Sequence, residues 1–221
     1  MQAVRGALQL HAARATTSFI ICVRLDRNLC GDNLIGMAHR VCPWWVGYLL
    51  ASPLRRLLQD PCKIVKPYVS EGMTILEPGP GMGFFTLELA RLVGPKGRVI
   101  AIDVQPRMLE ALVRRARKAG LAERIETRQP KGDDLGIDDV RGAADFALAF
   151  AMVHEVPNAD ALLADLHGAL KPGAKMLLAE PVGHVSAEDY QNTVATAQKA
   201  GFTIESRPAI RRSQAVVLVR P

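Results

Sequence analysis

A glycine-rich segment contains the first residues that could do chemistry, Glu77-Pro-Gly-Pro-Gly-Met-Gly83. Glycines lack a Cβ atom, so a ligand can approach their backbone, and free amides at the start of a following helix can meet a carboxylate or phosphate. A dinucleotide-binding turn would need a glycine at position 84, where this sequence has Phe84. Glu77 would repel a pyrophosphate and favour an ammonium group. The segment therefore favours a nucleoside that carries an amino acid over NAD.

A second candidate is Asp103, which lies 24 residues after Gly79 and ends the apolar run Val99–Ile102. A carboxylate at this place could accept hydrogen bonds from both hydroxyl groups of a ribose. The alternative is a helix cap, because Pro106 opens a predicted helix three residues later.

Two histidines and a glutamate follow predicted strands. His154 and Glu155 come after the apolar run 145–151, and His184 comes after the run 174–180. The carboxyl ends of parallel strands meet at one edge of a sheet, where a substrate would lie. An imidazole titrates near neutral pH, so His154 or His184 could act as a general base, with Glu155 as a further catalytic candidate. The alternative is that all three cap backbone groups in loops.

The cysteines give no indication of a metal site. All four precede residue 63, at spacings of 8, 12 and 20 that match no zinc pattern. Acids near the predicted strand ends do not form the cluster that a magnesium site would need. We expect no metal, reduced thiols and a cytoplasmic protein.

Alternating apolar runs and helical periods predict the elements that must position these groups. We expect strands at 73–77, 98–103, 124–129, 145–151, 174–180, 202–206 and 214–220. We expect helices at 84–93 and 106–118, after Asn158, and from Ser186 to Gly201. The last two strands have no helix between them and should pair antiparallel. The fold class is therefore α/β, a doubly wound, mostly parallel seven-stranded sheet.

The N-terminal third differs from the remainder. Residues 1–36 are predicted to be a loosely ordered extension, residues 37–70 a helical segment, and residues 71–221 the main domain. Trp44, Trp45 and Tyr48 share a helical face, which predicts an N-terminal helical lid over a ligand cleft. The alternatives are a helix that only packs on the domain, or peripheral membrane contact through residues 42–60.

The distribution of charge and apolar residues limits which classes of partner this protein can bind. Residues 1–70 hold nine Lys/Arg and three Asp/Glu, whereas residues 71–221 hold nineteen of each. A balanced main domain disfavours a nucleic-acid partner. No apolar stretch approaches the roughly 18 residues that a membrane-spanning helix requires.

These motifs together give the stretch 62–181 a resemblance to the class I S-adenosylmethionine-dependent methyltransferases, in particular to the small-molecule, methyltransferase type 11-like branch. Glu77–Gly83 resembles the first motif of that family, and Asp103 is similar to its second. Met152–Val156 and Leu170–Leu178 resemble the segments that follow strand four and form strand five. The resemblance implies a Rossmann-like methyltransferase fold.

The resemblance also implies S-adenosyl-L-methionine as the cofactor and a role for each matching residue. Glu77, Gly79 and Gly81 would surround the methionine part, and Pro80 and Gly83 of the same turn are further cofactor-binding candidates. Asp103 would hold the ribose, and Val104 and Met108 would flank the adenine.

The third motif departs from the family pattern. Lys131 stands where an acid commonly contacts the adenine amine. The contact could come instead from Gly132, Asp133 or Leu135, and the sequence does not choose among them.

Methyl transfer from a sulfonium is an in-line displacement, so the site mainly aligns the acceptor and excludes water. The motif of amino-methylating nucleic-acid enzymes is missing after strand four, and no cysteine follows Cys62 to bind a metalloid. A small organic acceptor is therefore expected. The alternatives are a non-catalytic S-adenosylmethionine-binding regulatory or assembly protein, or an RNA methyltransferase anchored by the basic N-terminal third.

Overall fold

The computed structural model describes residues 55, 59–130 and 135–221, which all lie in one compact unit, His39–Pro221. The predicted extension 1–36 and Trp44, Trp45 and Tyr48 of the predicted lid lie outside the described residues. So do Lys131, Gly132 and Asp133.

A seven-stranded sheet forms the centre of the described part, in the order β3-β2-β1-β4-β5-β7-β6. Four neighbouring pairs are parallel, whereas β5–β7 and β6–β7 are antiparallel. This topology confirms the predicted doubly wound, mostly parallel sheet. The strands are β1 (Thr74–Pro78), β2 (Arg98–Ile102), β3 (Ile125–Arg128), β4 (Ala144–Phe150), β5 (Leu170–Pro181), β6 (Thr203–Ser206) and β7 (Ser213–Val219).

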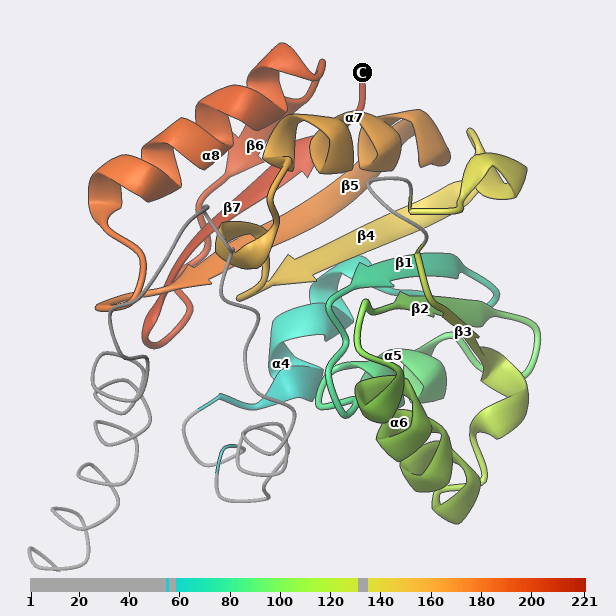
Figure 1. Cartoon of the computed structure of the whole chain (residues 1–221). Helices are drawn as coiled ribbons and strands as arrows, with labels where there is room; N and C mark the ends of the chain where they lie inside the picture. The colour runs from blue at the N-terminus through green and yellow to red at the C-terminus, as the bar shows by residue number, and fades with distance from the viewer. Residues whose placement is uncertain (1–54, 56–58, 131–134) are drawn as a thin grey trace, which may run out of the picture. The chain divides into compact units, whose positions relative to one another are not determined.

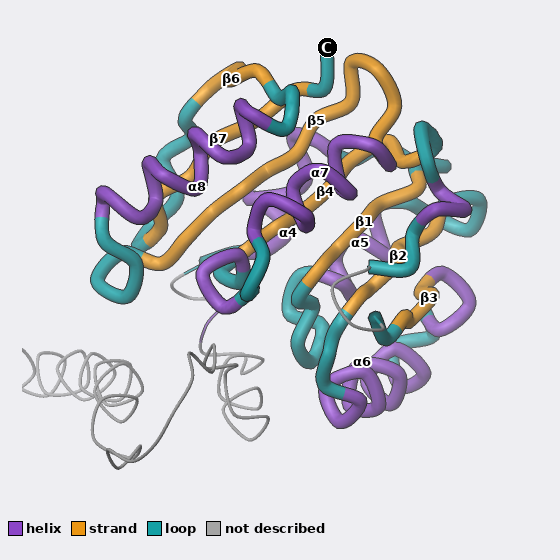
Figure 2. Tube along the Cα trace, turned by 45° about the horizontal axis from the view of Figure 1, so that its top comes forward, coloured by secondary structure: helices purple, strands orange, loops and turns teal. Residues whose placement is uncertain are grey.

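Helices cover both faces of the sheet, with α7 and α8 on one face and α4, α5 and α6 on the other (Figure 1, Figure 2). Neighbouring residues of each central strand point to opposite faces, so Leu76 packs with the first group and Ile75 with the second. The helices are α4 (Pro61–Val65), α5 (Thr86–Leu92), α6 (Pro106–Lys118), α7 (Ala159–Ala169) and α8 (Ala187–Lys199), and short 3-10 turns include η4 (Val153–Glu155). None of the helices in this part of the chain has the length and apolarity that a membrane crossing requires.

Polar side chains cap the two helices of the first face, which begin where the sequence predicted. The Asn158 side chain accepts a hydrogen bond from the amide of Ala161, and Ser186 accepts one from the amide of Asp189. These bonds satisfy amides that have no partner within the helix.

Strand β5 begins four residues earlier than predicted. Leu170 pairs with Ala144 across a register shift, so Lys171-Pro-Gly173 lies within the strand rather than between helix and strand. Gly173 has a φ of +77°, and its amide donates to the carbonyl of Arg220. Pairing with distant residues, rather than local turn chemistry, decides this boundary.

Candidate cofactor and acceptor site

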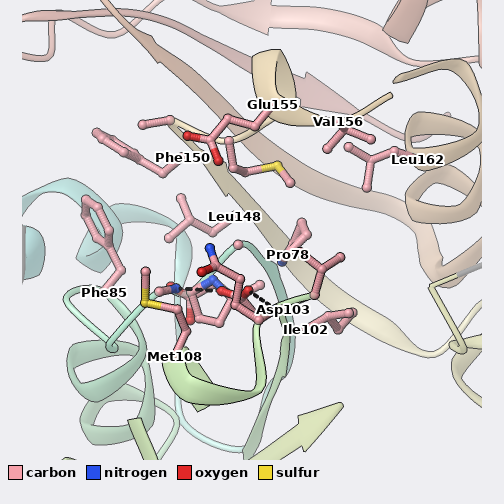
Figure 3. Close-up of a pocket in the computed structure, with 18 of the residues that line it drawn as sticks. Pro78, Phe85, Ile102, Asp103, Met108, Leu148, Phe150, Glu155, Val156 and Leu162 are labelled. Atoms are coloured by element: carbon pink, nitrogen blue, oxygen red, sulfur yellow. Dashed lines mark hydrogen bonds between the residues drawn. The ribbon is translucent and has the colours of Figure 1, made fainter. Parts of the chain in front are cut away.

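The carboxyl ends of β1, β2 and β4 border a cavity of about 470 Å³ (Figure 3). β1 and β4 are neighbours in the sheet, and the strand order reverses between them, which is where ligands bind in open α/β sheets. Most of the lining side chains are apolar, and Glu77, Asp103 and Glu155 place carboxyl groups among them. The volume and the lining suit a small ligand.

The glycine-rich turn connects β1 to α5 along this cavity. Gly79, Gly81 and Gly83 have φ values of +66°, +53° and +81°, a region that favours glycine. A Cβ atom on Gly79 would lie 2.7 Å from the Cβ of Met152, and one on Gly83 would collide with Leu112. A Cβ on Gly81 would meet nothing within 4 Å among the described atoms. Packing therefore demands the first and third glycines, whereas the second leaves space beside a ligand.

Glu77 ends β1 with a side chain that is only 3% exposed. Its Oε2 atom and the Oγ1 atom of Thr86 have no hydrogen-bond partner among the described residues. Burial raises the pKa of Glu77 to about 8; the nearby Thr86 hydroxyl lowers this pKa in part, and Asp103 raises it further. A buried carboxyl oxygen without a partner in the wall of a cavity fits a ligand ammonium group.

Asp103 directly follows β2, the parallel neighbour of β1, and is 8% exposed. Its Oδ1 accepts from the amide of Gln105 at 2.9 Å, and its Oδ2 accepts from the amide of Gly81 at 3.3 Å. Burial raises its pKa, while these two bonds lower it in part. Each oxygen retains acceptor capacity, so two ligand hydroxyls can bind a carboxylate that the backbone already orients.

The other predicted cofactor residues divide into two groups. Pro80, Val104, Met108 and Leu135 line the cavity, whereas Gly83 does not. Gly83 supports the turn by packing on α6.

The three predicted catalytic residues lie together at the ends of β4 and β5. Only Glu155 lines the cavity, across from Asp103 (Figure 3). His154 packs edge-on against His184, with ring centroids 4.8 Å apart, and its Nδ1 lies 2.6 Å from Oε2 of Glu180. The histidines are therefore set back behind Glu155.

Sequence reasoning missed Arg55, which also lines the cavity. Its guanidinium lies 4.2 Å from the ring centroid of Phe84 and bonds to Gln59, whose amide donates to Ser213. Burial lowers the pKa of Arg55 to about 10, so the group stays cationic at neutral pH. No local pattern marks this arginine as a cavity residue, because the aromatic ring on which it stacks, Phe84, comes from a distant segment.

Ala151 also lines the cavity and has a φ of +56°, which is unusual for a residue with a Cβ atom. Its amide donates to the carbonyl of Ala179 at 2.7 Å. Such strain is typical of functional sites, and here it turns the chain from β4 toward Met152 and Glu155.

Comparison with known proteins identifies relatives of this fold and site. A family model described as a methyltransferase domain matches residues 69–210. A demethylmenaquinone methyltransferase from Lactobacillus johnsonii is 31% identical over 100 residues, which cover 45% of this chain and 40% of that protein. A ubiquinone/menaquinone biosynthesis C-methyltransferase from Pasteurella multocida is 30% identical over 112 residues, 51% of this chain and 41% of that protein. The chain thus matches about two fifths of the length of these curated relatives.

Among solved structures, a SAM-dependent methyltransferase from Aquifex aeolicus superimposes with a TM-score of 0.73. The match has 24% identity and covers 81% of this chain and 99% of that one. At this identity the likeness concerns the fold.

Proposed function

Because this chain belongs to the methyltransferase-domain family and is an S-adenosylmethionine-dependent enzyme, we propose that it methylates a small organic acceptor held in the cavity at the ends of β1, β2 and β4. The bound cofactor would supply a methyl group attached to a positively charged sulfur. The sulfur leaves as a neutral thioether, so no acid is needed to protonate the leaving group. The protein then has to align the acceptor with the methyl carbon and exclude water.

The cofactor contacts are assigned from the polar groups in the cavity wall. We assign Glu77 to the ammonium of the methionine part, with Gly79, Pro80 and Gly81 along its backbone. Asp103 accepts from the ribose hydroxyls, and Val104, Met108 and Leu135 contact the adenine. The observation that carries this proposal is the unsatisfied buried carboxyl oxygen of Glu77, because a cationic ligand satisfies it and a pyrophosphate does not.

The acceptor side is assigned to the wall around Glu155 and Phe150, with His154 and His184 behind it. Its apolar and aromatic lining suits an acceptor with an apolar body. The names of the two curated relatives support a quinol-like acceptor, although only part of their length matches. We further propose that the protein works in the cytoplasm.

Calorimetry tests the cofactor assignment. S-adenosylhomocysteine should bind, and Asp103→Ala should weaken its binding about 10- to 100-fold, the usual effect of losing charge-assisted hydrogen bonds. NADH should bind far more weakly. Tighter binding of NADH would overturn the assignment.

Activity is tested with S-adenosylmethionine and a panel of quinol, phenol, amine and thiol acceptors, with S-adenosylhomocysteine formation as the readout. Methylation of at least one acceptor is expected. Inactivity toward every acceptor, together with tight cofactor binding, would instead support a regulatory or assembly role.

A further inference from the structure

We propose that Glu155, His154 and Glu180 form a path that takes a proton away from the acceptor, so that the natural acceptor is one that loses a proton from the methylated atom. The inference rests on the proposed function and adds to it the class of acceptor. Glu155 is the group that would touch the acceptor, and the other two residues act through it.

Glu180 holds the inner end of this path. It is fully buried at the end of β5, and its Oε1 accepts from the amides of Val153 and His154 at 2.9 and 3.3 Å. Its Oε2 lies 2.6 Å from Nδ1 of His154. A carboxylate held by two amides keeps the proton of a neutral imidazole on Nδ1, so Nε2 is the nitrogen that takes up a further proton.

Glu155 connects the imidazole to the cavity. Its Oε1 lies 3.8 Å from Nε2 of His154, and its side chain reaches the cavity wall across from Asp103 (Figure 3). This distance is too long for a hydrogen bond, but a small side-chain rotation closes it when a proton lies between the two groups. His154 itself does not line the cavity, so Glu155 is the group through which it can serve the acceptor.

Two further titratable groups face this path from neighbouring elements. The His184 ring, from the loop after β5, packs edge-on against His154. Tyr190 of α8 lies near Glu180; its pKa is raised mainly by burial, opposed by Arg207, with the charge of Glu180 adding to the rise. Neither is placed between His154 and the cavity.

The proposed step balances as follows. The acceptor atom gives its proton to the Glu155 carboxylate and bonds to the methyl carbon as the carbon–sulfur bond breaks, with that electron pair remaining on sulfur. The proton then passes from Glu155 to Nε2 of His154, which becomes an imidazolium between two carboxylates. Each methyl transfer thus moves one proton from the acceptor to His154.

The first experiment measures, without any acceptor, how Glu155 affects the protonation of His154. Histidine ¹⁵N NMR of the full chain with S-adenosylhomocysteine, assigned with His154→Asn, should show His154 as the Nδ1–H tautomer. Glu155→Gln should lower the pKa of His154 by about one pH unit, because an adjacent anion is lost. An Nε2–H tautomer, or a titration of His154 that Glu155→Gln leaves unchanged, would overturn the path.

The second experiment measures methyl transfer to 1,4-dihydroxynaphthalene and 4-methylphenol, which lose a proton, and to pyridine, which does not. Glu155→Gln and His154→Asn should lower turnover of the hydroxyl acceptors by about 10²- to 10⁴-fold near neutral pH, with S-adenosylhomocysteine affinity unchanged. The defect should shrink as the pH approaches the pKa of the acceptor. His167→Asn, a matched variant of a histidine that packs on Phe202, should keep full activity.

The outcomes separate the two proposals. Three results would overturn the proton path and leave methyl transfer standing. They are a loss of turnover in the variants that is equal at every pH, full activity of Glu155→Gln, and preferred methylation of pyridine. If no acceptor is methylated while the cofactor binds, the proposed function fails, and the proton path that rests on it fails as well, whatever the NMR titration shows.

Discussion

Ionisation of the Glu77 carboxyl group is energetically unfavourable in the cavity wall. Its carboxyl group is buried, and one oxygen has no partner in the described part of the chain. With a pKa of about 8, the group is mostly protonated at neutral pH in the ligand-free protein. A ligand ammonium would favour the ionised form, so ligand binding and proton binding are linked at this residue.

The first prediction follows from that linkage. Binding of S-adenosylhomocysteine at pH 6.5 should release roughly one proton, because Glu77 ionises when it meets the ammonium. Calorimetry in buffers of different ionisation enthalpy measures this number. Glu77→Gln should abolish the release and weaken binding about 10- to 100-fold. Binding with no proton release in the wild type would show that Glu77 does not face the ammonium.

The second prediction concerns stability without ligand. Because the folded pKa of Glu77 lies above its unfolded value, the stabilising effect of its protonation is complete below pH 4.5 and is lost as the pH rises through about 8. Urea unfolding should therefore show a gain in stability of Glu77→Gln over the wild type that is larger at pH 8.5 than at pH 5.5. The same difference at both pH values would contradict the raised pKa.

The third prediction compares two glycines of the turn. Gly83→Ala should lower stability by more than about 1 kcal/mol, since it adds a collision with Leu112 to an unfavourable φ. Gly81→Ala also places a Cβ atom at a positive φ but adds no collision, so it should affect S-adenosylhomocysteine affinity more than stability. Urea unfolding and calorimetry on both variants measure the two effects. Equal losses of affinity would mean that Gly81 does not border the ligand.

At the scale of elements, the beginning of α8 is stabilised by residues that do not line the cavity. The Ser186 hydroxyl accepts from the amide of Asp189 at 3.0 Å and donates to the Asp189 carboxylate at 2.7 Å. This reciprocal arrangement begins α8, which packs Tyr190 and Val194 against the sheet.

The fourth prediction tests this cap. Ser186→Ala should lower the free energy of unfolding by about 1 kcal/mol, because one helix amide loses its partner. Affinity for S-adenosylhomocysteine should stay unchanged, since Ser186 does not line the cavity. Ser186→Asn, which restores a capping side chain, serves as the matched control. A loss of affinity in the alanine variant would indicate that α8 contributes to the site.

At the scale of the whole molecule, the site depends on the strand order. The groups assigned to the cofactor lie at or after the ends of β1, β2 and β3, whereas Glu155 follows β4 and Glu180 lies at the end of β5. Because these strands run parallel and lie side by side, their carboxyl ends bring Glu77 and Glu155, which are 78 positions apart in the sequence, to one cavity.

The fifth prediction follows from this arrangement. Deletion of residues 1–36 should leave S-adenosylhomocysteine affinity within about twofold and the unfolding midpoint unchanged, because the described cavity residues all lie between positions 55 and 162. The proposed lid, residues 37–70, stays in this variant. Calorimetry and urea unfolding check the result, and a tenfold loss of affinity would contradict it.

Much of this molecule follows from local sequence. Strand and helix periods, the caps at Asn158 and Ser186, and the glycine-rich turn are each decided by neighbouring residues, because side-chain direction and turn geometry have a short range. Helix α6 spans Pro106–Lys118 as predicted, since a proline at its start and an apolar stripe specify it locally. The acid at the end of β2 was found for the same reason.

Only the tertiary structure decided which of these groups meet. The insertion of β7 between β5 and β6, the early start of β5 at Leu170, the stacking of Arg55 on Phe84 and the pairing of Glu180 with His154 all join residues far apart in the chain. No local period encodes such contacts, because they depend on the burial of the whole sheet. The sequence by itself determined the elements and the cofactor turn, whereas packing placed Glu155 in the cavity and set both histidines behind it.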